Sequence, residues 1–205
     1  ALKSINNKKM SGSMELPYFV ANNVLFGGRD SIFFNEIRNR RGLAYYIHSL
    51  ERRINHYPVI SFVSNPQANL IDSALKVVSD QLALIFKKQE SLKKMNQEEW
   101  NAQFDSYKNA AILNMSTPGG RLGRRKAIVL GIFSYEYWKT APWEWKVDQN
   151  DSQKALNRAW TVSNSQLYSI VGDSKKLIPV IKKYYPKFSV QVIPYNKVIH
   201  SSAYN

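Results

Sequence analysis

The chain has 205 residues, of which 44% are hydrophobic and 13% aromatic, and its formal net charge is +14. These values are typical of one globular domain rather than of a disordered chain. The absence of cysteine excludes a disulfide framework, a thiol nucleophile and any cysteine-ligated metal site. The apolar runs are far shorter than the roughly 20 residues of a membrane span, so we expect a soluble protein that attracts polyanions or acidic partners.

The first part of the sequence predicts two helices. Apolar residues recur at helical spacing through 18–25, and a pair of glycines ends that helix. A second helix over 32–41 begins after an N-cap at Asp30 or Ser31. It ends in three arginines and then Gly42, the residue type expected just past a helix.

A β-hairpin is expected to follow. Over 43–50 the apolar period changes to two, which predicts a strand with Leu43, Tyr45 and Ile47 on one face. A second strand is expected at 57–65, after a charged connection.

The remaining sequence predicts mainly helices, with two further strands near the end. The expected helices span 70–85, 96–111, 121–138, 150–160 and 174–185. The second of these has capping-box residues at Asn96 and Glu99, and the fourth has an N-cap at Asn150 or Asp151. Strands are expected at 165–173 and 188–194. The order of elements implies an α+β fold in two layers, a largely antiparallel sheet with helices packed on one face.

Motifs of self-sufficient catalysis are absent from the sequence. There is no nucleophile elbow, Walker loop or dinucleotide fingerprint. The three histidines, His48, His56 and His200, do not have the spacing of a zinc-peptidase motif. We therefore expect no catalytic residue and no metal site in this chain.

The segment 22–49, "NNVLFGGRDSIFFNEIRNRRGLAYYIHS", combines paired glycines, a helix that ends in arginines and a Gly-Leu-Ala-Tyr turn into a strand. It resembles a motif in the second of the two homologous halves of the pitrilysin and insulinase family of zinc peptidases, which includes the mitochondrial processing peptidases. The matching positions are Asn23, Leu25, Gly27, Gly28, Ser31, Phe34, Ile37, Arg38, Gly42, Leu43, Ala44, Tyr45, Ile47 and Ser49.

The resemblance implies that residues 1–205 form a single half-domain with the LuxS/mitochondrial-processing-peptidase-like metallohydrolase fold. It also implies that Arg38 and Tyr45 bind peptide substrate in a chamber shared with a homologous half, which carries a His-x-x-Glu-His motif and the zinc ion. This chain is then the non-catalytic, substrate-binding half of a zinc metalloendopeptidase, with its partner on the same polypeptide or on a separate subunit. Bacterial relatives of this type imply a location in the periplasm or cell envelope.

The sequence departs from the family pattern at three places. Arg29 replaces the third glycine, and Ile32 replaces the arginine after the serine. The first 15 or so residues are polar, whereas family half-domains begin with an apolar strand. Either that strand is lost or altered, or residues are missing from the chain as given. The sequence therefore does not decide which strand forms one edge of the sheet.

Two alternative functions fit the composition. A nucleic-acid-binding module would use the positive charge, the aromatic segment 133–146 and a basic cluster. That cluster consists of Arg121, Arg124, Arg125 and Lys126. A purely structural subunit of a peptidase complex would not use Arg38 or Tyr45 on substrate. We expect Arg40 and Arg41 to be solvated cations or charge on the chamber wall rather than specific ligands.

Overall fold

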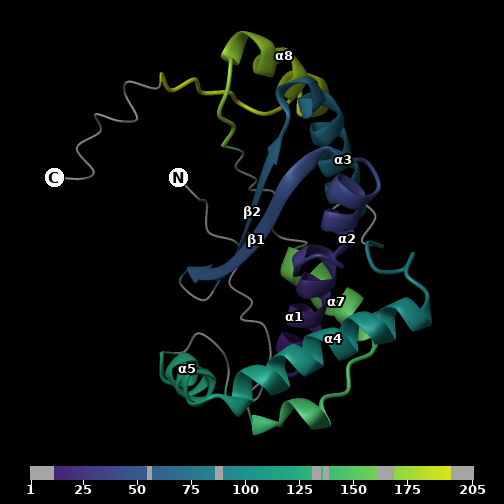
Figure 1. Cartoon of the computed structure of the whole chain (residues 1–205), viewed down its shortest axis with the longest axis vertical. Helices are drawn as coiled ribbons and strands as arrows, with labels where there is room; N and C mark the ends of the chain where they lie inside the picture. The colour runs from purple at the N-terminus through teal and green to yellow at the C-terminus, as the bar shows by residue number, and fades with distance from the viewer. Residues whose placement is uncertain are drawn as a thin grey trace, which may run out of the picture.

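The computed structural model describes residues 12–54, 57–85, 90–130, 135, 139–160 and 169–194. Helices dominate, and the described residues form one sheet of two antiparallel strands, so the fold is α+β (Figure 1). In chain order the elements are α1 (Gly12–Phe26), α2 (Ile32–Phe34), the π-helix η1 (Asn35–Asn39), β1 (Ala44–Ile54), β2 (Tyr57–Pro66), the 3₁₀ turn η2 (Ala68–Leu70), α3 (Ile71–Ala83), α4 (Gln97–Ser116), α5 (Pro118–Val129), the 3₁₀ turn η4 (Pro142–Glu144), α7 (Gln149–Trp160) and α8 (Ser174–Tyr184).

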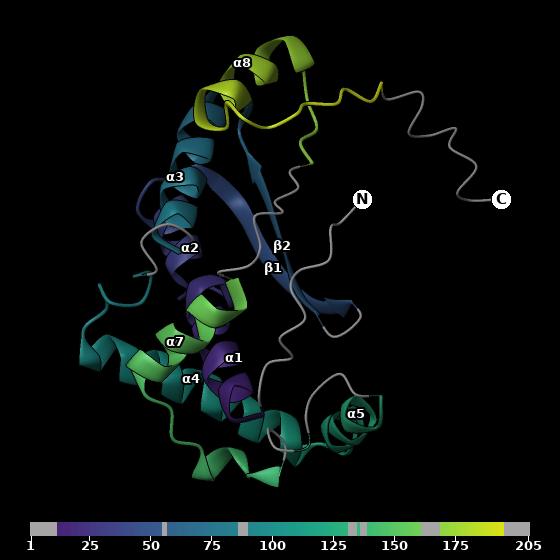
Figure 2. The same cartoon turned by 180° about the vertical axis from the view of Figure 1, so that it is seen from behind.

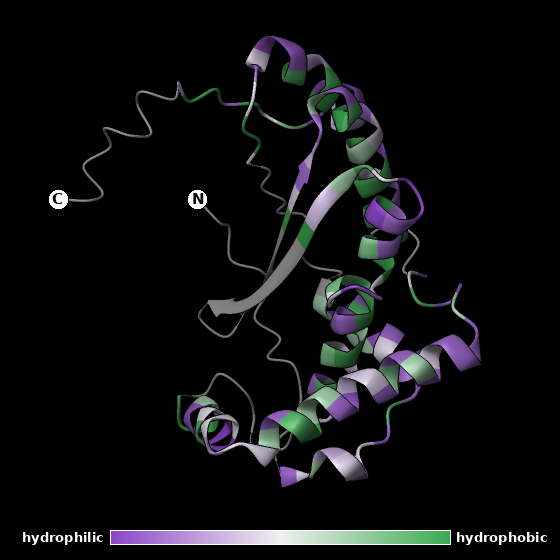
Figure 3. Ribbon diagram, viewed as in Figure 1, coloured by the Kyte–Doolittle hydropathy of each residue, from purple (hydrophilic) through white to green (hydrophobic). Residues whose placement is uncertain are grey.

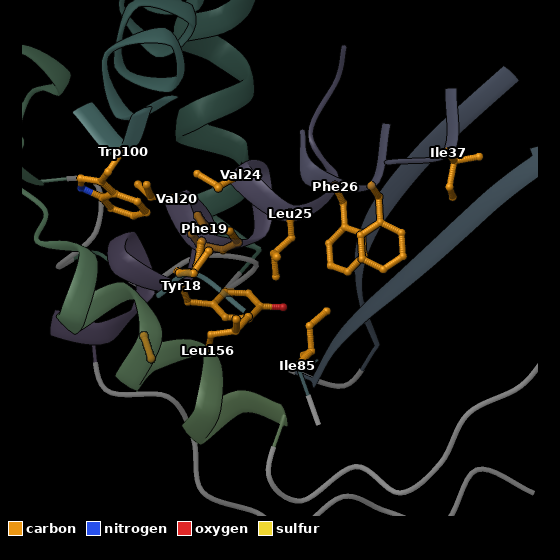
Figure 4. Close-up of a cluster of buried hydrophobic side chains, with 14 of the residues drawn as sticks. Tyr18, Phe19, Val20, Val24, Leu25, Phe26, Ile37, Ile85, Trp100 and Leu156 are labelled. Carbon is orange, nitrogen blue, oxygen red and sulfur yellow. The ribbon is translucent and has the colours of Figure 1, made fainter. Parts of the chain in front are cut away.

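Helix α1 is the central helix of the core. It begins at Gly12, well before the predicted helix at 18–25, and its residues from Tyr18 to Phe26 are buried except for the half-buried Asn23. A helix that is buried on nearly all sides needs neighbours around it. Helices α4 and α7 supply them through Trp100 and Leu156, which belong to the same hydrophobic cluster (Figure 4).

Helix α4 has the predicted capping box and the predicted apolar line. The Asn96 Oδ1 accepts a hydrogen bond from the Glu99 backbone N–H at 2.9 Å, and the Glu99 Oε2 accepts one from the Asn96 N–H at 3.0 Å. Trp100 is only 1% exposed, and further along the helix the Tyr107 ring stacks on Trp145 with centroids 6.0 Å apart. These contacts attach α4 to both α1 and the segment before α7.

Helix α7 holds the loop before α4 through two glutamines one turn apart. The Gln149 Nε2 donates to the carbonyl oxygens of Leu92 and Met95, at 2.8 and 3.0 Å. The Gln153 Oε1 accepts a hydrogen bond from the backbone N–H of Leu92, at 2.8 Å. Because Leu92 is fully buried, these side chains satisfy backbone groups that water cannot reach.

The two strands form a long ribbon that lies beside α3 in both views (Figures 1 and 2). Their antiparallel register runs from Ala44 opposite Pro66 to Ile54 opposite Tyr57, which confirms the predicted hairpin. Helix α8 packs on α3 at one end of the molecule, where the Lys183 Nζ lies 2.9 Å from the Asp72 Oδ1. Helices α4 and α5 lie at the other end (Figure 1).

Two strand predictions near the C-terminal end are wrong for the residues that the structure describes. Residues 188–194 have no strand, and neither does 169–173, the described part of the strand expected at 165–173. A strand exists only where a neighbouring strand takes up its backbone hydrogen bonds. Within the described ranges the sheet therefore has two strands, rather than the larger sheet that the sequence predicts.

Two helix starts also differ from the prediction. Helix α5 begins at Pro118, because the Thr117 hydroxyl accepts a hydrogen bond from the Gly120 N–H at 3.0 Å and caps the helix. The N-cap expected at Asn150 or Asp151 is instead Asp148, whose Oδ1 accepts from both of their backbone N–H groups. The polar start of the chain, residues 1–11, lies outside the described residues.

Candidate functional site

The helix that carries Arg38 begins with the predicted cap and ends in an unpredicted π-turn. The Ser31 Oγ accepts a hydrogen bond from the Phe34 N–H at 3.3 Å and donates to the Gly28 carbonyl at 2.9 Å. From Asn35 the helix widens, and the Arg40 N–H bonds to the Asn35 carbonyl five residues back. Single π-turns inside helices occur frequently at functional sites.

Gly42 turns the chain from this helix into β1, as the sequence predicts. Its φ of +60° is in the left-handed region, which glycine adopts without the steric cost that other residues incur. The Gly42 N–H bonds to the Arg38 carbonyl at 2.9 Å, and the Leu43 N–H bonds to the Ile37 carbonyl at 2.8 Å. Both Ile37 and Leu43 are buried, so the core fixes the two sides of the turn.

Strand β1 begins with a β-bulge that contradicts the predicted faces. Ala44 pairs with Pro66 and Ile47 pairs with Ser64, so Tyr45 and Tyr46 together lie opposite a single residue, Asn65. The Asn65 Oδ1 accepts a hydrogen bond from the Tyr46 N–H at 2.9 Å. A bulge of this kind redirects a side chain.

As a result Tyr45 does not share a buried face with Leu43. Leu43 and Ala44 are both buried, whereas Tyr45 is 79% exposed. The two irregularities on either side of Gly42, the π-turn and the bulge, together determine where Arg38 and Tyr45 point.

The side chains of Arg38 and Tyr45 meet. The Arg38 Cζ lies 4.4 Å from the centroid of the Tyr45 ring and 5.2 Å from that of the Phe34 ring. This is cation–π geometry, worth about 0.5–1 kcal/mol at an exposed site. In the described part of the chain, the half-buried guanidinium has no carboxylate or carbonyl partner. The sequence predicts Phe34 as a position of the motif and not as part of the site. Its i, i+4 spacing to Arg38 is nevertheless a signal that the two side chains are neighbours on the helix.

The adjacent cations behave differently from Arg38. The Glu36 carboxylate lies 2.6 Å from the Arg40 guanidinium and 3.4 Å from that of Arg41. Both arginines are exposed. Ion pairs made by solvent-exposed arginines contribute little to stability, so we expect little from these two. Their exposure is in line with cations that face solvent, and a role as chamber-wall charge stays a prediction. Within the described residues of this segment, Arg38 is the arginine without a carboxylate partner.

The chemistry open to this arrangement is recognition of an oxygen acceptor. A guanidinium that contacts aromatic rings through its faces keeps its N–H groups at its edge, in a planar fork that matches a carboxylate or a peptide carbonyl. The exposed Tyr45 hydroxyl adds a donor beside it. Within the described residues, the site therefore provides hydrogen-bond donors and positive charge.

No group of three or more histidine, cysteine, aspartate or glutamate residues in the described ranges is arranged to hold a metal ion. His56 and His200 lie outside those ranges, and for His48 the structure describes the backbone alone. Among the described helices, none combines the length and the apolar composition needed to cross a membrane.

Comparison with known proteins gives a likeness of fold. No protein-family model matches the chain, and the search of curated proteins finds no relative. Among solved structures the chain is similar to the crystal structure of a conserved protein from Enterococcus faecalis V583, with a TM-score of 0.52 and 20% sequence identity. The similarity covers 74% of this chain and 34% of that one, so this chain spans about a third of the length of its structural neighbour.

Proposed function

We propose that this chain is the non-catalytic, substrate-binding half of a zinc metalloendopeptidase, and that Arg38 and Tyr45 bind the peptide substrate. The proposal includes the two-layer fold implied by the motif, in which further strands add to β1 and β2. The observation that carries the proposal is the Arg38 guanidinium, which contacts the Phe34 and Tyr45 rings and has no carboxylate partner among the described residues. Its donors match the carbonyl oxygens and terminal carboxylate that a peptide presents.

The zinc ion belongs to the partner half in this proposal. The described residues of this chain do not fit a zinc site, since they contain no cluster of three suitable ligands. A zinc ion on the partner half would supply an activated water for hydrolysis. The role of this chain is to bind the peptide in one orientation, so that the scissile bond faces the partner half.

The test is hydrolysis of a fluorogenic peptide by this chain alone, by the zinc-motif half alone and by the two halves together, each with and without a chelator. The proposal expects chelator-sensitive cleavage only when both halves are present. If adding this chain to a folded, zinc-loaded partner half does not change the rate, the proposal fails for that pair.

Variants at the site separate substrate binding from a structural role. Tyr45→Phe keeps the ring under the guanidinium and removes only the hydroxyl, whereas Arg38→Gln removes the positive charge and the fork. If these donors stabilise charge on the scissile carbonyl, each loss lowers kcat by about 10²- to 10³-fold. If they hold only the bound peptide, KM rises while kcat stays.

Arg40→Gln is the matched control, because it removes an arginine two residues away that already pairs with Glu36. Association of the two halves is measured by gel filtration for every variant. If Arg38→Gln and Tyr45→Phe leave both kcat and KM unchanged in an intact complex, the chain is assigned to the structural-subunit alternative.

A further inference from the structure

Helix α5 is a strongly cationic surface helix. Between Pro118 and Val129 it carries Arg121, Arg124, Arg125 and Lys126 and no acidic residue. It packs against the end of α4 and lies apart from α1 and α7 in both views (Figures 1 and 2). The like charges on such a helix repel one another, and together they attract anions.

Two of its arginines attach α5 to the rest of the molecule. The Arg121 guanidinium donates to the carbonyl oxygens of Met115 and Ser116, at 3.1 and 2.9 Å, and so binds the C-terminal end of α4. The Arg124 guanidinium donates to the Thr140 carbonyl at 3.4 Å. Ala127 is buried on the same inner side. These contacts fix which face of α5 points outward.

The outward face has an apolar centre with a cation on each side. Leu122 and Val129 lie seven residues apart, so they share one face of the helix, and they are 68% and 84% exposed. Helical spacing places Arg125 and Lys126 on the two flanks of this pair. Both cations are exposed and have no acidic partner within the described ranges. Figure 3 shows hydrophobic and hydrophilic residues interleaved around α5.

Two further exposed leucines lie close to α5 in the sequence. Leu130, directly after the helix, is 59% exposed, and Leu113 near the end of α4 is 68% exposed. Water-exposed aliphatic side chains are stabilised when they are transferred from water to an apolar phase. The outward face can therefore bind anions through its cations and an apolar phase through its aliphatic side chains.

We propose that this outward face of α5 binds an anionic lipid bilayer, with the helix lying in the plane of the interface. Charge complementarity supports this occupant, because unpaired cations on both flanks match acidic headgroups while Leu122 and Val129 enter the acyl boundary. A polyanion without an apolar phase, such as single-stranded nucleic acid, uses the cations but gains nothing from the aliphatic side chains. The inference is independent of the peptidase proposal, since it uses none of the Arg38 site.

The experiment is co-sedimentation of the full chain with vesicles of phosphatidylglycerol and phosphatidylcholine, compared with vesicles of phosphatidylcholine alone, at about 0.1 M salt. Binding is expected on the anionic vesicles only. The double variant Arg125→Gln, Lys126→Gln should weaken the partition coefficient by about 30-fold, from about fivefold per cation. The double variant Leu122→Ser, Val129→Ser should weaken it by at least about 10-fold.

The matched control is Lys175→Gln, Lys176→Gln, which removes the same charge from exposed positions on α8 at the opposite end of the molecule. It should leave vesicle binding unchanged. Equal losses in the control and in the α5 charge variant overturn the proposal, because binding would then follow net charge alone. Vesicle binding that does not respond to the aliphatic substitutions also overturns it; oligo(dT) binding lost only with the cations would then assign the surface to nucleic acid.

Discussion

Replacing Gly42 by alanine tests whether the left-handed turn holds the candidate site together. The φ of +60° at this position costs an L-residue about 1–2 kcal/mol. A Cβ added there meets no atom within 4 Å, so no steric term adds to that cost. The Gly42→Ala variant should therefore lose about 1–2 kcal/mol of unfolding free energy, which lowers the Tm by about 2–8 °C in a chain of this size.

The assay is urea unfolding followed by far-UV circular dichroism, with two companion variants. Gly123→Ala is the control, because Gly123 lies within α5 and a Cβ there also meets nothing within 4 Å. It should raise stability by about 0.5–1 kcal/mol. Gly42→Asn should cost less than Gly42→Ala, since asparagine tolerates the left-handed region. If Gly42→Ala is as stable as the parent chain, or gains stability as Gly123→Ala does, the reasoning about the turn is refuted.

Three further predictions concern the scaffold. Gln153→Leu should lose about 1–3 kcal/mol of unfolding free energy in urea, because the buried Leu92 N–H then lacks its acceptor; an unchanged midpoint would contradict that account of the loop. Asn96→Ala should lose about 1 kcal/mol through the missing helix cap, with thermal unfolding as the readout and no loss as the contrary result. The hydrogen bond from Lys183 lowers the pKa of the Asp72 carboxyl below its ordinary value of 3.8, so the stabilisation is full above that pH and is lost as the pH falls through the folded-state value. We therefore expect Asp72→Asn to be less stable than the parent chain at neutral pH and equally stable in strong acid, as measured by unfolding at a series of pH values. A stability difference that persists unchanged into strong acid would exclude this ion pair as its source.

The parts of the fold that the sequence predicts correctly are those set by neighbouring residues. The Ser31 cap, the box of Asn96 and Glu99, and the turn at Gly42 each depend on a hydrogen bond or a φ value within a few residues. The same is true of the β1–β2 hairpin, whose strands are close in the chain. Local chemistry suffices for such features.

The parts that were missed depend on contacts between distant segments. Residues 188–194 have the composition of a strand, yet no described strand lies beside them to pair with. The meeting of Arg38 and Tyr45 is in line with the motif, but the π-turn and the bulge that bring it about have no signal in the sequence. They flank Gly42, on either side of which Ile37 and Leu43 are buried, and burial depends on packing across the whole core. Whether the pair binds substrate stays a prediction.

The π-turn at Asn35–Asn39 makes the site sensitive to chain length as well as to residue type. A π-turn contains one residue more than the α-turn it replaces, and here the extra residue lies between the Ser31 cap and the Gly42 turn. Deleting a single residue between these two points would preserve the residue types of the motif but would remove the π-turn, which brings Arg38 to its present position between the cap and the turn. Among related sequences, the spacing between Ser31 and Gly42 is then a stricter marker of an intact site than the presence of an arginine and a tyrosine.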